Sequence, residues 1–181
     1  MAYIKVKWRK DSPKKRELSA QDYEEYLLKD RGTDLVTSTN NCIEGSAIED
    51  FKRPDRVVVG AETEHAKKLM ERLYRPLNLN RVPLMITGLE TAELIKYAAN
   101  AFLATKITFI NEMADLCEKV GANVQDVARG MGSDNRIGAK FLHAGPGYGG
   151  SCFPKDTLAL VKTGQDAGAP ITIVEQVVGV N

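Results

Sequence analysis

Cysteine and histidine are scarce in this sequence. The chain has three cysteines and two histidines among 181 residues, with no C-x-x-C or H-x-x-x-H spacing. An odd number of cysteines argues against a disulfide framework and predicts a reducing, cytoplasmic location. His65 and His143 lie far apart in the sequence, which argues against a zinc site. We therefore expect no metal and a fold stabilised by an ordinary hydrophobic core.

The net charge is small, and long apolar runs are lacking. The formal net charge is +1, so the whole chain has no field that would attract nucleic acid or an anionic membrane. No apolar run approaches the roughly 20 residues that span a bilayer, and the N-terminus lacks the apolar core of a secretory signal. The one short basic run, RKDSPKKR at 9–16, is interpreted as a solvated loop rather than a nucleic-acid contact. We expect neither nucleic acid nor membrane as a partner.

Hydrophobic periodicity divides the chain into an α/β start and a mainly α-helical remainder from about residue 90. Residues 1–43 form an unassigned segment, with an alternating strand pattern at 2–8 and a helix pattern from Ser19 to Gly32. Strand patterns at 56–60 and 82–88 flank an amphipathic helix that is predicted to end near Pro76. The predicted helices that follow are a long central one over 90–120, ended by Gly121, and shorter ones at 123–132, 154–168 and 170–181.

The stretch around Cys152 carries the strongest chemical signal. Four glycines within 145–150 allow a close approach of the backbone to a ligand. They lead to a thiol at the start of a helix whose first turn contains Pro154, and Lys155 adds positive charge. A helix N-terminus and a nearby cation both favour a thiolate, which is the nucleophile for attack on a carbonyl carbon. The alternative is an inert buried cysteine beside a tight turn. The G-x-G-x-x-G match at 145–150 is rejected as a dinucleotide site, because no clear strand precedes it.

Two further groups have weaker signals. Lys96 and Asn100 lie four residues apart on the long helix, so they share a face and could donate to a developing oxyanion. Spacing alone favours a solvated lysine and an ordinary helix asparagine. Arg136 and Lys140 could contact a phosphate or a sugar, or could be surface charges.

Three segments of the sequence resemble the UDP-glucose 6-dehydrogenases of the UDP-glucose/GDP-mannose dehydrogenase family. They are EGSAIEDFKRPDRVVVG at 44–60, TAELIKYAANAFLATKITFINE at 91–112 and GSDNRIGAKFLHAGPGYGGSCFPKD at 132–156. The resemblance covers about residues 44–181 and implies a fragment of the family's central, dimerisation domain. It implies an NAD-dependent enzyme that oxidises the C6 alcohol of a UDP-sugar twice, to a carboxylate.

The resemblance also implies residue roles. Cys152 would form a thiohemiacetal and then a thioester, Lys96 and Asn100 would stabilise the oxygen anion at C6, and Asp156 would assist water. Glu44 would be a further catalytic carboxylate. The residues implied to contact the sugar nucleotide are Arg136 (from a neighbouring subunit), Tyr148, Gly149, Gly150 and Lys155.

Three departures from the family pattern set the limits of the prediction. Residues 1–43 are not similar to the family's NAD-binding domain, so we expect the cofactor domain to be absent. The family's C-terminal domain is expected to be missing after Asn181. Asn40 stands where the family has a second carboxylate, and an asparagine cannot act as a base. The alternative function is a non-catalytic module that forms a homodimer through the long helix.

Overall fold

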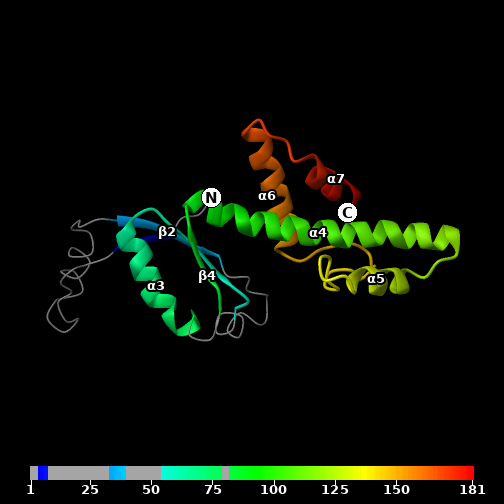
Figure 1. Cartoon of the computed structure of the whole chain (residues 1–181). Coiled ribbons are helices and arrows are strands. Elements are labelled where there is room, and N and C mark those ends of the chain that lie inside the picture. The colour runs from blue at the N-terminus through cyan, green and yellow to red at the C-terminus, as the bar shows by residue number, and fades with distance from the viewer. Residues whose placement is uncertain (1–3, 8–32, 40–53, 79–81) are drawn as a thin grey trace. The chain divides into compact units, whose positions relative to one another are not determined.

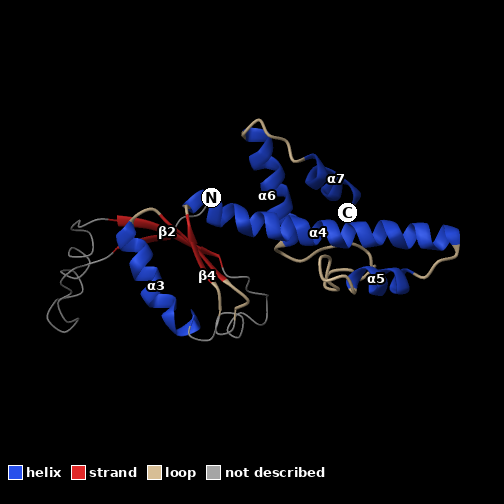
Figure 2. Cartoon of the chain, viewed as in Figure 1, coloured by secondary structure: helices blue, strands red, loops and turns tan. Residues whose placement is uncertain are grey.

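The computed structural model describes residues 4–7, 33–39, 54–78 and 82–181 (Figure 1). They fall into two compact units, Met1–Leu94 and Ile95–Asn181. Glu44, Asn40 and the helix predicted from Ser19 lie outside the described residues. Figure 2 shows the strands in the first unit, whereas the second consists of helices and loops.

The first unit contains a sheet with strand order β1-β2-β3-β4. The strands are β1 Ile4–Lys7, β2 Thr33–Thr39, β3 Val57–Ala61 and β4 Leu84–Thr87. β1 and β2 pair antiparallel, as do β2 and β3, whereas β3 and β4 are parallel with Val57 opposite Leu84. β2 and β3, which lie on either side of the predicted division near residue 43, pair in one sheet.

Helix α3, Glu64–Asn78, connects the two parallel strands and packs on the sheet. Its buried residues Ala66, Met70 and Tyr74 form one core with Val57 and Val59 of β3. Residues three to four apart lie on one helix face, which is why a single apolar stripe suffices for this contact. The helix continues two residues beyond Pro76, where the sequence predicted its end.

The second unit is built on the part of the long helix α4, Leu89–Val120, that follows Leu94. The helix ends before Gly121, as predicted, and Gly121 has a φ of 75°. Three helices follow: α5 Val124–Gly132, α6 Phe153–Asp166 and α7 Thr172–Val180. Ala101 of α4, Leu160 of α6 and Val174 of α7 form one buried cluster. A second cluster joins Ala104, Tyr148 and Val177. These contacts place the start of α6 against α4.

Candidate active site

Cys152 lies at the N-cap of α6, at the end of the glycine-rich loop. Its side chain is exposed and makes no capping hydrogen bond, and Pro154 occupies the first turn of the helix. Its sulfur lies 3.8 Å from the Ser151 hydroxyl oxygen. Cys117 is buried, so the alternative of an inert buried cysteine describes Cys117 and not Cys152.

Asp156 lies one turn after Cys152 and is 1% exposed. Its amide nitrogen donates to the carbonyl oxygen of Cys152 at 2.9 Å, which is the first α-helical hydrogen bond of α6. Asn100 of α4 donates through Nδ2 to Oδ2 of Asp156 at 2.7 Å. A buried carboxylate needs such a partner, because leaving it without one costs free energy. Asn100 and Asp156, which are 56 residues apart in sequence, therefore meet beside Cys152.

Two lysines lie near this pair on different elements. Lys155 Nζ is 3.8 Å from Oδ1 of Asp156, and its side chain is 71% exposed. Because the lysine is largely exposed and the separation is long for an ion pair, this contact contributes little to stability. Lys96 is half-buried one helical turn before Asn100 on α4. The shared face that the spacing predicted for Lys96 and Asn100 follows from the continuous helix.

The glycine-rich loop is fixed at two points by asparagine side chains. Asn111 of α4 accepts a hydrogen bond from the amide of Gly145 at 2.9 Å. Asn181, after α7, accepts from the amide of Tyr148 at 2.7 Å and donates to its carbonyl oxygen at 3.1 Å. Gly149 and Gly150 are exposed. Neither asparagine was found by sequence reasoning, because nothing in the local pattern signals a partner 33 or 34 residues away.

The Tyr148 ring does not reach into the open loop. It is 8% exposed and packs against Ala104 and Val177. Its ring also meets that of Phe153 edge to face, with 6.2 Å between the centroids. Sequence reasoning proposed Tyr148 as a contact to the substrate, whereas the structure places its side chain in the core beside the first residue of α6.

Arg136 lies on the exposed loop that follows α5. Its guanidinium bonds to the Asp134 carboxylate, with Nη2 to Oδ2 at 2.6 Å and Nε to Oδ1 at 3.1 Å. These hydrogen bonds lower the pKa of Asp134 and raise the pKa of Arg136. Lys106 of α4 donates to the carbonyl oxygens of Ile137 and Gly138, both at 3.0 Å, and so holds this loop to the long helix.

The start of α3 is a helix N-terminus of the first unit, the kind of place where a dinucleotide phosphate can bind. Thr63 caps α3 through a hydrogen bond from the amide of Ala66 to Oγ1 at 3.0 Å. The first turn of α3 also carries Glu64, whose pKa is lowered by the hydrogen bond from Lys67, so that it remains ionised. A capped, acidic helix start does not suit a pyrophosphate, which prefers free amides and no negative charge. The first turn of α3 is therefore not suited to hold the pyrophosphate of a dinucleotide.

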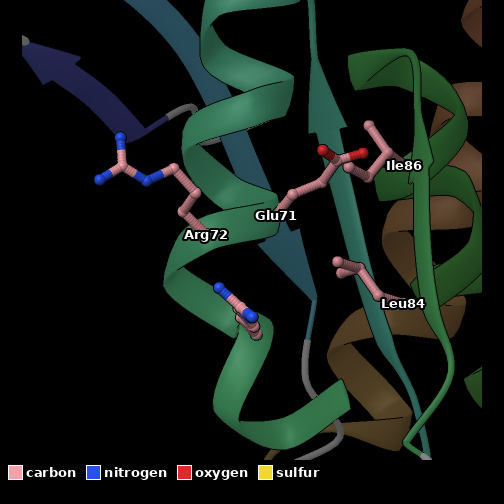
Figure 3. Close-up of a pocket in the computed structure, with 5 residues that line it drawn as sticks. Glu71, Arg72, Leu84 and Ile86 are labelled. Atoms are coloured by element: carbon pink, nitrogen blue, oxygen red, sulfur yellow. The ribbon is translucent and has the colours of Figure 1, made fainter. Parts of the chain in front are cut away.

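A shallow pocket of about 580 Å³ lies on α3 and β4 of the first unit. Figure 3 shows its lining residues, with the Glu71 side chain directed toward Ile86. None of the predicted site residues lines it. In the described part of the chain, no group of three or more His, Cys, Asp or Glu side chains could hold a metal ion. No described helix is both long and apolar enough to cross a membrane.

The geometry of the second unit defines a class of site. An exposed thiol begins a helix, and a buried carboxylate held by an amide lies one turn away, so this site offers a nucleophile beside a potential proton acceptor. Comparison with known proteins specifies the family. A profile of the UDP-glucose/GDP-mannose dehydrogenase family, central domain, matches residues 90–181, and one of the same family's NAD binding domain matches residues 13–78. This chain belongs to the UDP-glucose/GDP-mannose dehydrogenase family.

Curated relatives and a solved structure agree with this assignment. The chain is 70% identical over 149 residues to a UDP-glucose 6-dehydrogenase of Rhizobium meliloti, a match that covers 81% of this chain and 34% of the relative. It is 51% identical over 148 residues to UDP-glucose 6-dehydrogenase TuaD of Bacillus subtilis, covering 82% and 32%. A UDP-glucose dehydrogenase structure from Pyrobaculum islandicum superposes with a TM-score of 0.77 at 40% identity, covering 82% and 34%. The chain thus spans about a third of the length of each of these proteins.

One prediction is corrected by these matches. We expected no part of the cofactor domain, yet the NAD binding domain profile covers residues 13–78, which include β2, β3 and α3. The prediction was wrong because it depended on finding a glycine-rich fingerprint. A piece of such a domain that comprises a strand, a helix and a plain turn carries no fingerprint of its own.

Proposed function

We propose that this chain carries the thiol part of the active site of an NAD-dependent UDP-glucose 6-dehydrogenase. One observation carries the proposal: Cys152 begins α6 as an exposed thiol, while Asn100 of α4 holds the buried Asp156 one turn further on. The printed names of the relatives support UDP-glucose as the substrate. The alternative, a non-catalytic module, receives no support from these relatives, which are all named as dehydrogenases.

The proposed reaction converts the C6 alcohol of the sugar into a carboxylate, and NAD, when bound, would supply the hydride acceptor for both oxidations. After the first oxidation, the Cys152 thiolate attacks the C6 aldehyde. A carbon–sulfur bond forms, and the carbonyl electron pair moves to oxygen. Lys96 and the Asn100 amide, one helical turn apart on α4, would donate hydrogen bonds to that oxygen. Protonation gives a thiohemiacetal, and loss of a hydride and a proton from it gives a thioester.

Hydrolysis completes the proposed cycle. Water adds to the thioester carbonyl, the carbon–sulfur bond breaks, and the thiolate of Cys152 is regenerated together with the sugar carboxylate. Asp156 is proposed to orient this water or take its proton. Its Oδ2 is occupied by Asn100, whereas among the described residues Oδ1 has the exposed Lys155 ammonium at 3.8 Å. Oδ1 can still accept a hydrogen bond from water, which supports that role.

Binding of the sugar nucleotide is assigned to the surrounding loops. Gly149 and Gly150 are exposed and offer backbone amides, and Lys155 offers a largely exposed ammonium. Tyr148 would shape this loop from its buried ring rather than touch the sugar. Arg136 is proposed to reach the nucleotide bound in a neighbouring subunit. The Glu44 carboxylate is proposed as a further catalytic group from the resemblance alone.

A homodimer is part of the same proposal. Phe102, Phe109 and Leu116 are spaced by seven residues on α4, so they lie on one face of the helix. Their exposed fractions are 65%, 40% and 51%. Three large apolar side chains in one exposed row are typical of a surface that is covered by another protein. A second copy of the chain is the proposed occupant.

The test is NADH formation from NAD and UDP-glucose by the purified chain, with Cys152→Ala and Cys117→Ala as matched variants. Each variant removes one thiol, but only Cys152 is exposed. We expect turnover in the wild type and in the Cys117 variant, and none in the Cys152 variant. Asp156→Asn should accumulate an acyl adduct on Cys152 that mass spectrometry detects. No NADH from folded wild-type protein, or equal turnover in both cysteine variants, would overturn the proposal.

A further inference from the structure

The Asn181 side chain makes two hydrogen bonds to the backbone of the glycine-rich loop, as another peptide group would. Its Oδ1 accepts from the amide of Tyr148 at 2.7 Å, and its Nδ2 donates to the carbonyl oxygen of the same residue at 3.1 Å. Its own amide nitrogen donates to the Val177 carbonyl oxygen at 3.2 Å and so continues the hydrogen bonding of α7. The loop is therefore tied to the end of a helix by two directed bonds.

Gly147 makes this close approach possible. A Cβ atom built at Gly147 would lie 2.7 Å from Oδ1 of Asn181, which is closer than real Cβ contacts come. The φ of Gly147 is 126°, a backbone conformation that residues other than glycine rarely adopt. Gly147 and Asn181 thus fit each other as a pair, although the sequence separates them by 34 positions.

A path of contacts leads from this pair to the thiol. Asn181 fixes the backbone of Tyr148, and the buried Tyr148 ring packs edge to face on Phe153. Phe153 is the first residue of α6 and directly follows Cys152. We propose that Asn181 is a positioning residue, which holds the loop and the start of α6 so that the Cys152 thiol is presented in one place. This inference rests on the proposed function for its catalytic consequence.

The first test needs no activity. Hydrogen exchange of the Tyr148 amide is compared in the wild type, Asn181→Ala and the control Gln176→Ala. The control changes an exposed residue of α7, the helix that Asn181 follows. The Tyr148 amide should exchange at least tenfold faster in Asn181→Ala and at the wild-type rate in Gln176→Ala. Unchanged exchange in Asn181→Ala would show that Asn181 does not hold the loop.

The second test separates positioning from a merely structural role. In Asn181→Ala, kcat for UDP-glucose oxidation should fall at least tenfold while KM stays within about threefold, because a misplaced reacting group affects the chemical step more than binding. Asn181→Asp keeps the acceptor for the Tyr148 amide and loses the donor, so its kcat should be intermediate. A loosened loop with unchanged kcat would overturn the positioning role.

If the wild type forms no NADH, the proposed function fails, but the inference can still be decided. The rate of Cys152 alkylation by iodoacetamide is then followed by peptide mass spectrometry, with the buried Cys117 as the internal reference. A rate in Asn181→Ala that differs at least threefold from the wild type supports the role of Asn181 in presenting the thiol. Equal rates overturn it.

Discussion

At the scale of single residues, the hydrogen bond between Asn100 and Asp156 is the contact on which the site depends. Asp156 is buried, and the distance of 2.7 Å is that of a charge-assisted bond. The bond also joins the two helices that carry the proposed oxyanion donors and the thiol. A residue proposed to serve catalysis therefore also links α4 to α6.

Replacing Asn100 by alanine should therefore destabilise the second unit. The change leaves a buried carboxylate without its donor, and we expect the free energy of unfolding to fall by about 1–3 kcal/mol. Urea denaturation followed by circular dichroism measures this loss. Asn135→Ala, which truncates an exposed asparagine, is the matched control and should stay within about 0.5 kcal/mol of the wild type. Equal stability of the two variants would contradict the role of the bond.

The exposed pair Asp134–Arg136 gives a pH-dependent prediction. Hydrogen bonds from Arg136 lower the pKa of Asp134 below its ordinary value of 3.8. Because the pKa is lower in the folded state, the stabilising contribution is complete above pH 3.8 and is lost as the pH falls through the folded pKa.

An NMR titration of the Asp134 carboxyl group checks this shift. In Arg136→Gln, the pKa of Asp134 should return toward 3.8, and added salt should reduce the shift in the wild type because both groups are exposed. A pKa that is the same in both proteins would exclude Arg136 as the cause.

At the scale of elements, two helical glycines should respond in opposite ways to the same substitution. A Cβ at Gly164 in α6 would lie 2.8 Å from the Ala169 carbonyl oxygen and 2.9 Å from Ile171, where the chain turns toward α7. A Cβ at Gly130 in α5 would meet nothing within 4 Å. Helix propensity favours alanine at both positions, so the difference between them isolates packing.

We expect Gly164→Ala to lower the free energy of unfolding by about 1–3 kcal/mol, since overpacking outweighs propensity. Gly130→Ala should raise it by about 0.5–1 kcal/mol. Thermal and urea unfolding of the two variants test this pair. If both variants are stabilised, α6 and α7 do not pack as closely as the structure has them.

The long helix α4 gives a prediction about association. Its row of Phe102, Phe109 and Leu116 is proposed to be covered by a second copy of the chain, so a charge there should prevent dimerisation. We expect Phe109→Glu to be monomeric by light scattering at concentrations where the wild type is a dimer. Glu118→Lys changes an exposed residue of the same helix without adding charge to the row, and should remain a dimer. A monomeric wild type would contradict the proposal.

At the scale of the whole molecule, sequence periodicity predicted most of the elements. β1, β3, β4 and the helices α3 to α7 all lie at predicted positions, because their apolar spacing and end signals are local. The strand β2 was missed: Thr33–Thr39 has little apolar alternation, and its pairing with β3 is a long-range property. The predicted α/β start and mainly helical remainder are confirmed as a mixed fold.

The site was predictable to the extent that its chemistry is local. The loop, Cys152 and the first turn of α6 are continuous in sequence, and Asn100 shares a helix face with Lys96. The partners that hold this arrangement are not local. Asn111 and Asn181 reach the loop from 34 and 33 residues away, and no spacing rule announces such a contact. The burial of the Tyr148 ring was missed for the same reason, since a tyrosine among glycines gives no signal of burial.

The two compact units should respond separately to core mutations. The core of the first consists of residues from β3, α3 and β4, and the cores of the second use residues from α4, α6, α7 and the loop. Val59→Ala removes volume from a fully buried position of the first core. Leu160→Ala removes volume from the second core, and we expect it to lower the free energy of unfolding by about 2–5 kcal/mol. Hydrogen exchange should then rise in β3 and α3 for the first variant and in α6 and α7 for the second. If either variant accelerated exchange in both units alike, the chain would unfold as one cooperative body, and the Cys152 site would depend on the strand unit for its stability.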